Sequence, residues 1–191
     1  MTDIDWERYF SYEKDTGSIK WKERAPGDCS TERGRAIWNS KYAGKEAGSI
    51  HNDHVGSDRV ILTLKNKKYI AHRVCWEMVN GKIPQGMTVD HIDQNPLNNS
   101  ISNLRLATEL EQKKNMPMQK NNTSGATGVY WNKRTSKWDA KIGVMGRTIS
   151  IGSSSNKEEA LAMREKAEKE NRFHINHGKQ FAANLRAGRK V

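Results

Sequence analysis

The chain has 191 residues, 35% of them hydrophobic, which suits one medium domain or two small ones but not one large core. It holds no apolar run of about eighteen residues and no basic-then-apolar start, so we expect neither a membrane-spanning helix nor a signal peptide. A formal net charge of +11 favours a nucleic-acid partner, while Cys29 and Cys75 match no zinc-binding spacing and are expected as free thiols.

The N-terminal part predicts a scaffold rich in β-hairpins. Residues 6–22 predict one hairpin, in which aromatic residues precede a turn at Asp15-Thr16-Gly17. Residues 59–71 predict a second hairpin, because apolar residues alternate on both sides of a turn placed at Asn66-Lys67.

Two further segments complete this scaffold. Residues 23–57 are rich in glycine, serine and charge without a sustained period, and we expect them to be mostly loop. From Ala71 to Met78, apolar residues recur on one helical face, and Gly81 is expected to end that helix.

Residues 87–115 arrange a strand, a loop, a strand and a short helix in fewer than thirty positions. In chain order these parts are Val89–Asp93, Asn98–Ser100, Asn103–Ala107 and a helix that begins at a Thr108/Glu111 capping box and contains Gln112. Such a ββα unit is too small to be held by hydrophobic burial alone. We therefore expect a bound metal or a surrounding scaffold to stabilise it.

The segment Asp90-His91-Ile92-Asp93 is followed by Asn103-Leu104-Arg105, which begins twelve residues after His91, and then by Ala-Thr. This pattern resembles the HNH homing endonucleases of phages and introns, and the resemblance extends upstream to Ala71–Trp76. It implies a ββα-metal fold that hydrolyses DNA phosphodiester bonds with one divalent ion per site, Mg²⁺ or Mn²⁺.

The resemblance also implies a role for each motif residue. His91 is expected to be the general base, because neutral imidazole accepts a proton near physiological pH. Asp90 is expected to bind the metal, and Asn103 to brace the loop that orients His91. His72 and Arg73 belong to the resemblance but have no clear role from spacing: His72 is a candidate packed histidine, and Arg73 is a candidate DNA contact, as is Arg105.

The second metal ligand departs from the family pattern. In this branch of the family an Asn or His lies nine residues beyond the central Asn, and that position is Gln112 here. The Gln carbonyl oxygen suits a hard cation, but its side chain is one methylene longer, and Glu111 and Asn115 are neighbouring candidates. The sequence leaves open a functional site that uses Gln112 and a degenerate nuclease in which Gln112 merely faces solvent.

The C-terminal part begins with a predicted linker at 116–126, which contains Pro117 and no apolar period. The elements expected after it are strands near 128–131, 137–144 and 147–151, a turn at Met145-Gly146, a helix from about 156 to 172 with a Ser155/Glu158 capping box, and a basic tail at 178–191.

Four segments of this part, Ser124–Trp131, Lys137–Ile142, Ile149–Gly152 and Glu158–Ala160, resemble an AP2-type DNA-binding domain. The resemblance implies a three-stranded antiparallel sheet packed on one helix, with the exposed sheet face in the major groove. Alternation directs inward Val129, Trp131, Trp138, Ala140, Ile142, Ile149 and Ile151, against Ala160, Met163 and Ala167.

The residues left on the outer face and in its turns are the expected DNA contacts. Those expected near bases are Tyr130, Asn132, Lys141, Thr148 and Ser150, and those expected at phosphates are Lys133, Arg134, Lys137 and Arg147. Residues 121–191 hold 14 Lys and Arg against 6 Asp and Glu, a net +8, so most of the chain's charge lies here.

Together these patterns predict an α+β architecture. Its parts are an HNH nuclease domain at 1–115 with a ββα-metal core at about 87–115, the linker, an AP2-like domain at 127–177 and the tail. We expect a divalent-metal-dependent, phage homing-type endonuclease that acts on double-stranded DNA in the cytoplasm of the host. No membrane or protein partner is expected, and monomer and homodimer both stay open.

Two other functions are possible for this sequence. One is a sequence-specific DNA-binding protein with a degenerate nuclease site. The other is an RNA-binding module, which is less favoured because no paired aromatics are exposed on an RNP-like strand.

Overall fold

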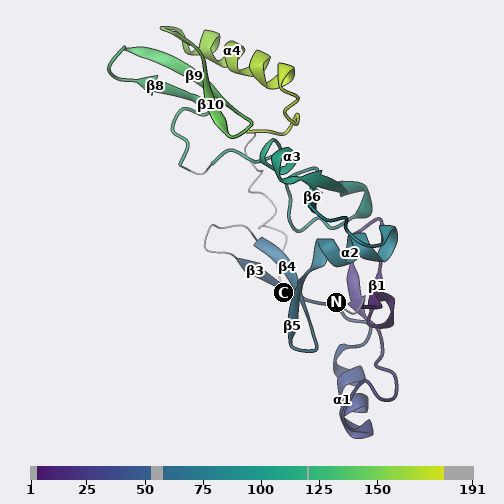
Figure 1. Ribbon diagram of the computed structural model, residues 1–191. Coiled ribbons are helices and arrows are strands. Elements are labelled where there is room, and N and C mark those ends of the chain that lie inside the picture. Colours follow the sequence, from purple (N-terminus) through teal and green to yellow (C-terminus); the bar gives the residue numbers. More distant parts are fainter. Residues whose placement is uncertain (1–3, 53–57, 120, 179–191) are drawn as a thin grey trace. The chain divides into compact units, whose positions relative to one another are not determined.

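The computed structural model describes residues 4–52, 58–119 and 121–178, and the chain divides into two compact units between Ala107 and Thr108 (Figure 1). Short helices and antiparallel sheets make the fold mixed α and β. The elements up to this division are the 3₁₀ turn η1 (Trp6–Arg8), β1 (Phe10–Tyr12), β2 (Ile19–Trp21), α1 (Glu32–Tyr42), β3 (Ser49–Asn52), β4 (Asp58–Leu64), β5 (Lys67–Ile70), α2 (Ala71–Asn80), β6 (Met87–His91), η2 (Ile101–Asn103) and β7 (Leu104–Thr108). Those after it are α3 (Glu109–Lys113), β8 (Val129–Asn132), β9 (Lys137–Val144), β10 (Arg147–Ser154) and α4 (Lys157–Glu170).

The first predicted hairpin is confirmed as β1 and β2. Phe10 pairs with Trp21 and Tyr12 with Ile19, which places the buried side chains of Phe10 and Ile19 on the core side. Gly17, in the turn, has a φ of +76°, a conformation that glycine adopts without steric cost. The aromatic positions of this hairpin therefore anchor it to the core of the first unit.

The second hairpin, β4 and β5, is also confirmed, but its turn was placed one residue too late. Leu64 pairs with Lys67, so the turn residues are Lys65 and Asn66, whose φ angles are +48° and +60°. Two left-handed residues in a two-residue loop match the right-handed twist of the strands. β3 adds a third antiparallel strand beside β4.

The expectation that residues 23–57 are mostly loop missed two elements, α1 and β3, and residues 53–57 of this segment lie outside the described residues. Thr31 caps α1, and its hydroxyl accepts a hydrogen bond from the backbone N–H of Gly34. The helix buries none of its residues fully, and its Trp38 packs edge-on against Trp21 with ring centroids 5.3 Å apart. A tertiary aromatic contact, rather than a local apolar period, holds this helix.

The helix α2 confirms the predicted one, and it ends before Gly81, whose φ is +77°. Its buried face consists of Ala71, Val74 and Cys75, which pack with apolar residues of the β4 strand and of β6 and β7 in one core. At its solvent side, Trp6 Nε1 donates to Glu77 Oε2 at 2.7 Å. Both cysteines are free thiols, as expected.

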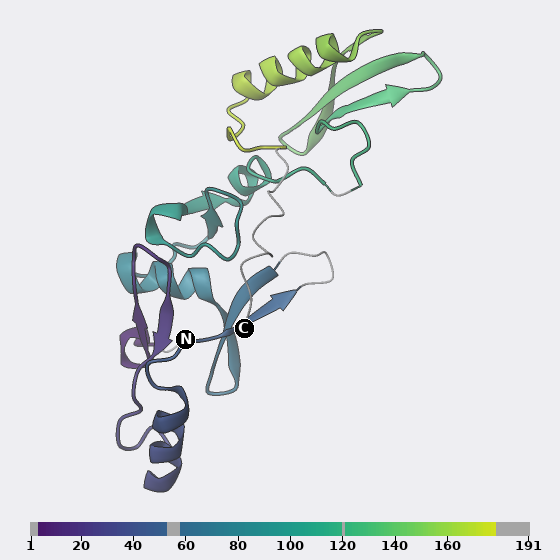
Figure 2. The same cartoon turned by 180° about the vertical axis from the view of Figure 1, so that it is seen from behind.

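The second unit contains a three-stranded antiparallel sheet in the order β10–β9–β8, with α4 along one face (Figures 1 and 2). These strands and the helix were predicted, but the predicted Ser155 cap is wrong. Asn156 caps α4, and its Oδ1 accepts from the backbone N–H of Glu158 at 2.8 Å. A register shift between Ser150 and Gly152 bends β10.

The inward face of this sheet is only partly covered. Val129, Ala140 and Ala160 form its buried core, whereas Trp131 and Ile149, which were predicted to be inward, are 44% and 49% exposed. Trp131 lies on the edge strand β8 and packs against Trp138, with ring centroids 5.4 Å apart, rather than under α4. The apolar residues of α4 that pack on this sheet are Ala160, Leu161 and Met163, and they cover Val129 and Ala140 rather than Trp131 and Ile149.

Residues predicted as a linker make ordered contacts inside the second unit. The Met116 carbonyl accepts a hydrogen bond from the backbone N–H of Gly178 at 2.9 Å. Ser124 is buried, and its hydroxyl donates to the Ala126 carbonyl.

The division of the chain at Ala107 and Thr108 falls inside the predicted nuclease domain, whose proposed limits stay predictions. Of the predicted tail, residues 179–191 lie outside the described residues. Among the described helices, none has the length and apolarity needed to cross a bilayer.

Candidate active site

Asp90 and His91 lie at the end of β6, which pairs with β7 in a two-stranded sheet. The buried side chains of Val89 and Leu104 join this sheet to the core below it. Beyond the strands, the Ile92 N–H donates to the Asn103 carbonyl at 2.9 Å. The two strands were predicted, and they hold Asp90 and His91 at the point where the chain leaves the sheet.

Asn103 joins both ends of the loop that follows His91. Its Nδ2 donates to Asp93 Oδ1 at 2.8 Å and to the Asn98 carbonyl at 2.9 Å, and its Oδ1 accepts from the Asp93 N–H at 3.0 Å. The Asn103 residue is only 8% exposed, whereas its partner Asp93 is exposed, so these bonds lie at the boundary between the core and solvent. This is the bracing geometry that the sequence suggested, and its contribution to catalysis stays a prediction.

The β1–β2 hairpin forms hydrogen bonds with the same loop at Asn99 and with Ile101, which follows it. Tyr12 donates its hydroxyl to the Asn99 carbonyl at 2.6 Å, and the Lys14 carbonyl accepts from the Ile101 N–H at 2.8 Å. A Cβ on Gly17 would lie 2.5 Å from the backbone of Asn99 and Ser100. Only glycine permits this approach, so a segment about eighty residues upstream fixes the loop beside His91.

His91 is held in one orientation by Asn99. The His91 residue is 7% exposed, and its Nε2 lies 3.1 Å from Asn99 Oδ1. Because an amide oxygen only accepts, this bond selects the tautomer with the proton on Nε2 and the lone pair on Nδ1. Burial lowers the pKa of His91, and this outweighs the opposing effects of the Asn99 hydrogen bond and of Asp93 and Asp90.

His72 of α2 packs against His91, with the two rings 4.7 Å apart and nearly perpendicular. Burial lowers the pKa of His72 to about 3, and the nearby His91 and Arg73 act in the same direction. His72 is therefore a neutral ring at physiological pH, and it restricts the positions that the His91 ring can take.

Asp90 contacts a cation of the opposite strand. The Arg105 guanidinium of β7 donates to Asp90 Oδ2 from Nε at 3.2 Å and from Nη2 at 3.0 Å. The Arg105 side chain is 30% exposed and that of Asp90 is 11% exposed. Arg105 was predicted to contact DNA, and in the structure it is hydrogen-bonded to Asp90, the predicted metal ligand. Its contact with DNA stays a prediction.

The first unit offers few side chains that could bind a divalent ion. No group of three or more His, Cys, Asp or Glu side chains that could hold a metal occurs among the described residues. Mg²⁺ is usually bound by one or two carboxylates together with substrate phosphates and water. The single carboxylate of Asp90, beside a neutral His91, fits an ion that is bound together with a nucleic-acid phosphate.

The candidates for a second metal ligand belong to the second unit. The predicted capping box at α3 is confirmed: Glu111 Oε2 accepts from the Thr108 N–H at 2.8 Å, and the Thr108 hydroxyl accepts from the Glu111 N–H. The carboxylate of Glu111 thus caps the N-terminus of α3. Gln112 is exposed on α3, Asn115 is buried, and their relation to a metal stays a prediction.

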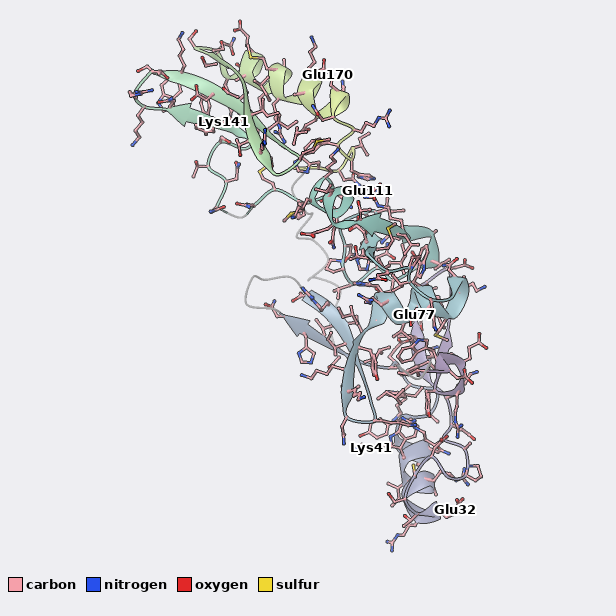
Figure 3. All side chains as sticks on the ribbon, in the orientation of Figure 1. Glu32, Lys41, Glu77, Glu111, Lys141 and Glu170 are labelled. Carbon is pink, nitrogen blue, oxygen red and sulfur yellow. The ribbon has the colours of Figure 1, made fainter. Side chains whose placement is uncertain are left out.

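The predicted DNA-contacting residues of the second unit gather on one face and its turns. Tyr130, Lys141, Thr148 and Ser150 share the face opposite α4, where Lys141 Nζ, labelled in Figure 3, lies 5.1 Å from the Tyr130 ring centroid. Asn132 Nδ2 donates to Asp139 Oδ2 at 2.8 Å. The exposed cations beside this face are Lys133, Arg134, Lys137 and Arg147. In the first unit, Arg73 is exposed on α2.

Sequence patterns missed several residues that shape these regions. Asn99 carried a signal, since it belongs to an Asn-Asn-Ser run in a loop beside the motif. Tyr12 and Gly17 carried none, because their partners lie far along the chain. In the second unit, buried Arg164 donates to the Lys141 carbonyl and to Glu168, a role that an Arg on an exposed-looking helix does not suggest.

Comparison with known proteins places this site in a family segment. Residues 69–114, which contain Asp90, His91 and Asn103, match the family model described as HNH endonuclease. Protein 3.8 of Escherichia phage T7 is 45% identical over 76 residues, which are 40% of this chain and 63% of that protein. The uncharacterized HNH endonuclease L560 of Acanthamoeba polyphaga mimivirus is 46% identical over 59 residues, which are 30% of this chain and 29% of that protein.

A solved structure, described as DNA binding and cleavage by the HNH homing endonuclease I-HmuI, aligns with 57% of this chain and 52% of its own. The sequence identity is 22% and the TM-score is 0.36, which is too low to define a shared fold. The family segment and the two viral relatives therefore carry the comparison. Since this chain spans less than two thirds of either relative's length, the resemblance concerns the segment and not the whole proteins.

Proposed function

We propose that this chain, which carries an HNH endonuclease segment at residues 69–114, is a divalent-metal-dependent endonuclease that hydrolyses phosphodiester bonds in double-stranded DNA. The observation that carries the proposal is the pair formed by Asp90 and His91 at the end of β6. His91 is buried, has a lowered pKa and is oriented by Asn99. A neutral, fixed imidazole beside a carboxylate is what phosphodiester hydrolysis requires.

In this proposal His91 acts as the general base. The Asn99 contact leaves the lone pair on Nδ1, and that atom takes a proton from the attacking water. Asn103 and the Tyr12 contact keep the loop from moving as the imidazole becomes charged. General-base catalysis by a positioned side chain contributes roughly 10²–10⁴-fold in rate.

Asp90 would hold the divalent ion, with Gln112 as the proposed second ligand from the sequence spacing. When bound, Mg²⁺ or Mn²⁺ supplies charge stabilisation at the leaving oxygen. Arg105 donates to Asp90 Oδ2 from Nε and Nη2 and so holds the carboxylate in one orientation. The metal requirement is therefore assigned to Asp90 first.

The outer face of the β8–β10 sheet is proposed to bind the DNA, as an AP2-like module. Its exposed cations would contact phosphates, and its polar side chains would face bases in the major groove. We further propose that the enzyme is of the homing type and phage-encoded, acts in the cytoplasm of the host, and cuts one strand per encounter because each chain has one site.

The experiment is a plasmid-nicking assay with the full chain. Wild-type protein is expected to convert supercoiled plasmid to the open circle with Mg²⁺ or Mn²⁺, and not with EDTA. Asp90→Asn keeps the side-chain shape and removes the charge, so it should need a higher metal concentration. Asp15→Asn, which removes an exposed carboxylate from the β1–β2 turn, is the matched control and should behave as wild type.

A second candidate function follows from the departure at Gln112. If the ligand set is incomplete, the chain is a sequence-specific DNA-binding protein with a degenerate nuclease site. Metal-independent DNA binding without any nicking, in Mg²⁺ or in Mn²⁺, would select this function and reject the endonuclease.

A further inference from the structure

The first unit has an open groove that uses none of the residues assigned to the active site. Its volume is about 330 Å³, at the lower end of the range for small-ligand sites. Its lining includes the aromatic rings of Trp21, Trp38 and Tyr42, the cations of Arg24 and Lys65, and Asn66. These residues come from β2, the segment after it, α1 and the β4–β5 turn, so tertiary folding assembles the groove.

Arg24 is fixed in the groove by aromatic rings and not by an anion. Its guanidinium carbon lies 4.4 Å from the Trp38 ring centroid, 5.3 Å from that of Trp21 and 4.9 Å from that of Tyr9. Asn39 hydrogen-bonds to its backbone N–H and carbonyl. Within residues 4–52, 58–119 and 121–178, the Arg24 guanidinium forms no ion pair within 4.0 Å. Asp28, which is ion-paired with Arg8 at 2.6 Å, also interacts with the Arg24 charge, and the guanidinium N–H groups of Arg24 are the donors proposed for a ligand.

The three aromatic rings line the groove at different inclinations. Trp21 and Trp38 meet edge to face, with an interplanar angle of 89°, and Trp38 and Tyr42 are tilted by 40° with centroids 5.2 Å apart. Tyr42 is 37% exposed at the end of α1, next to Lys41, which Figure 3 labels. Arg24 lies over the Trp38 ring, and Lys41 Nζ lies 5.2 Å from the Tyr42 ring centroid, so a flat group would meet the ring edges and the faces that these cations leave uncovered.

The charge of the groove is of one sign. Arg24 and Lys65 line it, and no Asp or Glu does. Lys65 is exposed and is held in a left-handed turn conformation, with φ +48°, beside Asn66. A ligand matched to this groove carries a planar ring together with a negative charge.

We propose that this groove binds one unpaired deoxynucleotide of a DNA strand, with its base against Trp38 and Tyr42 and its phosphate at Arg24 and Lys65. Bases stack on aromatic side chains with little sequence preference, and Arg and Lys are the usual phosphate partners. The proposal rests on the proposed function for the identity of DNA as the ligand. It adds a second DNA contact, in the first unit, that recognises an unstacked nucleotide.

The binding test uses the full chain in EDTA, so that no cleavage occurs, and fluorescence anisotropy with two labelled duplexes. One duplex is fully paired and the other is identical but has one additional unpaired thymidine. Wild-type protein should bind the second duplex on the order of tenfold more tightly, the scale of one base–aromatic stack. Equal affinity for the two duplexes would overturn the proposal and would leave the rings with the sole task of anchoring α1.

Matched variants separate the groove from general charge. Lys65→Gln should remove most of the preference for the unpaired nucleotide, whereas Lys67→Gln removes the same charge from an exposed position of the same hairpin, outside the groove lining. Lys67→Gln should lower both affinities equally and keep their ratio. The preference for the unpaired nucleotide should therefore differ between the two variants. If both variants keep this preference, or if both lose it, Lys65 does not bind the nucleotide in the groove.

Photocrosslinking locates the nucleotide directly. A 5-iodouracil base at the unpaired position should crosslink, in EDTA, to the tryptic peptide 36–41, which contains Trp38 between cleavage sites after Arg35 and Lys41. Crosslinks confined to peptides of β8, β9 or β10 would reject the groove. Because the nicking assay is separate, nicking without this crosslink would reject only this inference, and this crosslink without nicking would reject only the endonuclease.

Discussion

In the first unit, Asp90 and His91 are 9% and 7% exposed, and each is held by a hydrogen-bonded partner, Asp90 by half-buried Arg105 and His91 by buried Asn99. In the second unit, the proposed DNA-contacting residues lie on an open sheet face or in its turns, and most of them are exposed. The buried site depends on a few contacts between segments far apart in sequence. The open face depends on many separate charges, each of small effect. Remote substitutions should therefore damage the first region and barely affect the second.

The largest effect is expected from the base itself. His91→Ala should lower the cleavage rate about 10²–10⁴-fold, because the proton acceptor is lost, while DNA affinity changes little. His51→Ala, at an exposed histidine of β3, is the matched control and should cleave as wild type. A His91→Ala enzyme with undiminished nicking would remove this residue from the mechanism.

The next effect tests the remote brace. Gly17→Ala and Gly27→Ala both place a side chain at a positive φ, +76° and +87°, and share the cost of that conformation. Only at Gly17 would the new Cβ meet backbone, 2.5 Å away, in the loop that carries Asn99. Gly17→Ala should therefore lose more stability in urea, by about 1–3 kcal/mol, and lose cleavage activity in addition. Equal losses in both variants would show that the hairpin does not position the loop.

The open face predicts a graded response. Replacing Lys133, Arg134 and Lys137 together by Gln removes three exposed charges from the β8–β9 turn and the first residue of β9. If all three contact phosphates, the slope of log K against log salt should become shallower by up to about 2.7, at roughly 0.9 for each contact. An unchanged salt slope would move the DNA anchor away from this turn.

The pH dependence follows from the lowered pKa of His91. The active base is the neutral imidazole, so its rate plateau should extend below the ordinary histidine pKa of about 6.5 before the rate falls in acid. Burial is the main cause, and it disfavours the charged form. A cleavage rate that halves above pH 6.5 with an unchanged DNA affinity would contradict the burial of this group in the working enzyme.

The smallest change concerns the second ligand. Gln112→Asn restores the residue usual in the family at the same position of α3 and should keep or modestly raise activity at low metal concentration. Gln112→Ala should raise the metal concentration needed for half-maximal rate. Wild-type metal dependence in Gln112→Ala would show that this side chain is not a ligand.

Elements defined by local chemistry were predictable from the sequence. Alternating apolar residues and turn residues predicted the hairpins and the sheet of the second unit. The capping box at Thr108 predicted the start of α3. The helix α1 was missed because Trp38 owes its place to Trp21 and not to an apolar period. The Asn99 contact to His91 and the Arg105 contact to Asp90 were missed because they depend on how strands and loops meet in space.

The measurement that tests the division between buried chemistry and exposed binding most directly is the single-turnover cleavage rate at saturating enzyme. His91→Ala should stay slow however much enzyme is added, because its defect is in the chemical step. The triple variant at Lys133, Arg134 and Lys137 should recover the wild-type rate once the DNA is saturated. A triple variant that stays slow at saturation, or a His91→Ala enzyme that reaches the wild-type rate, would contradict the account.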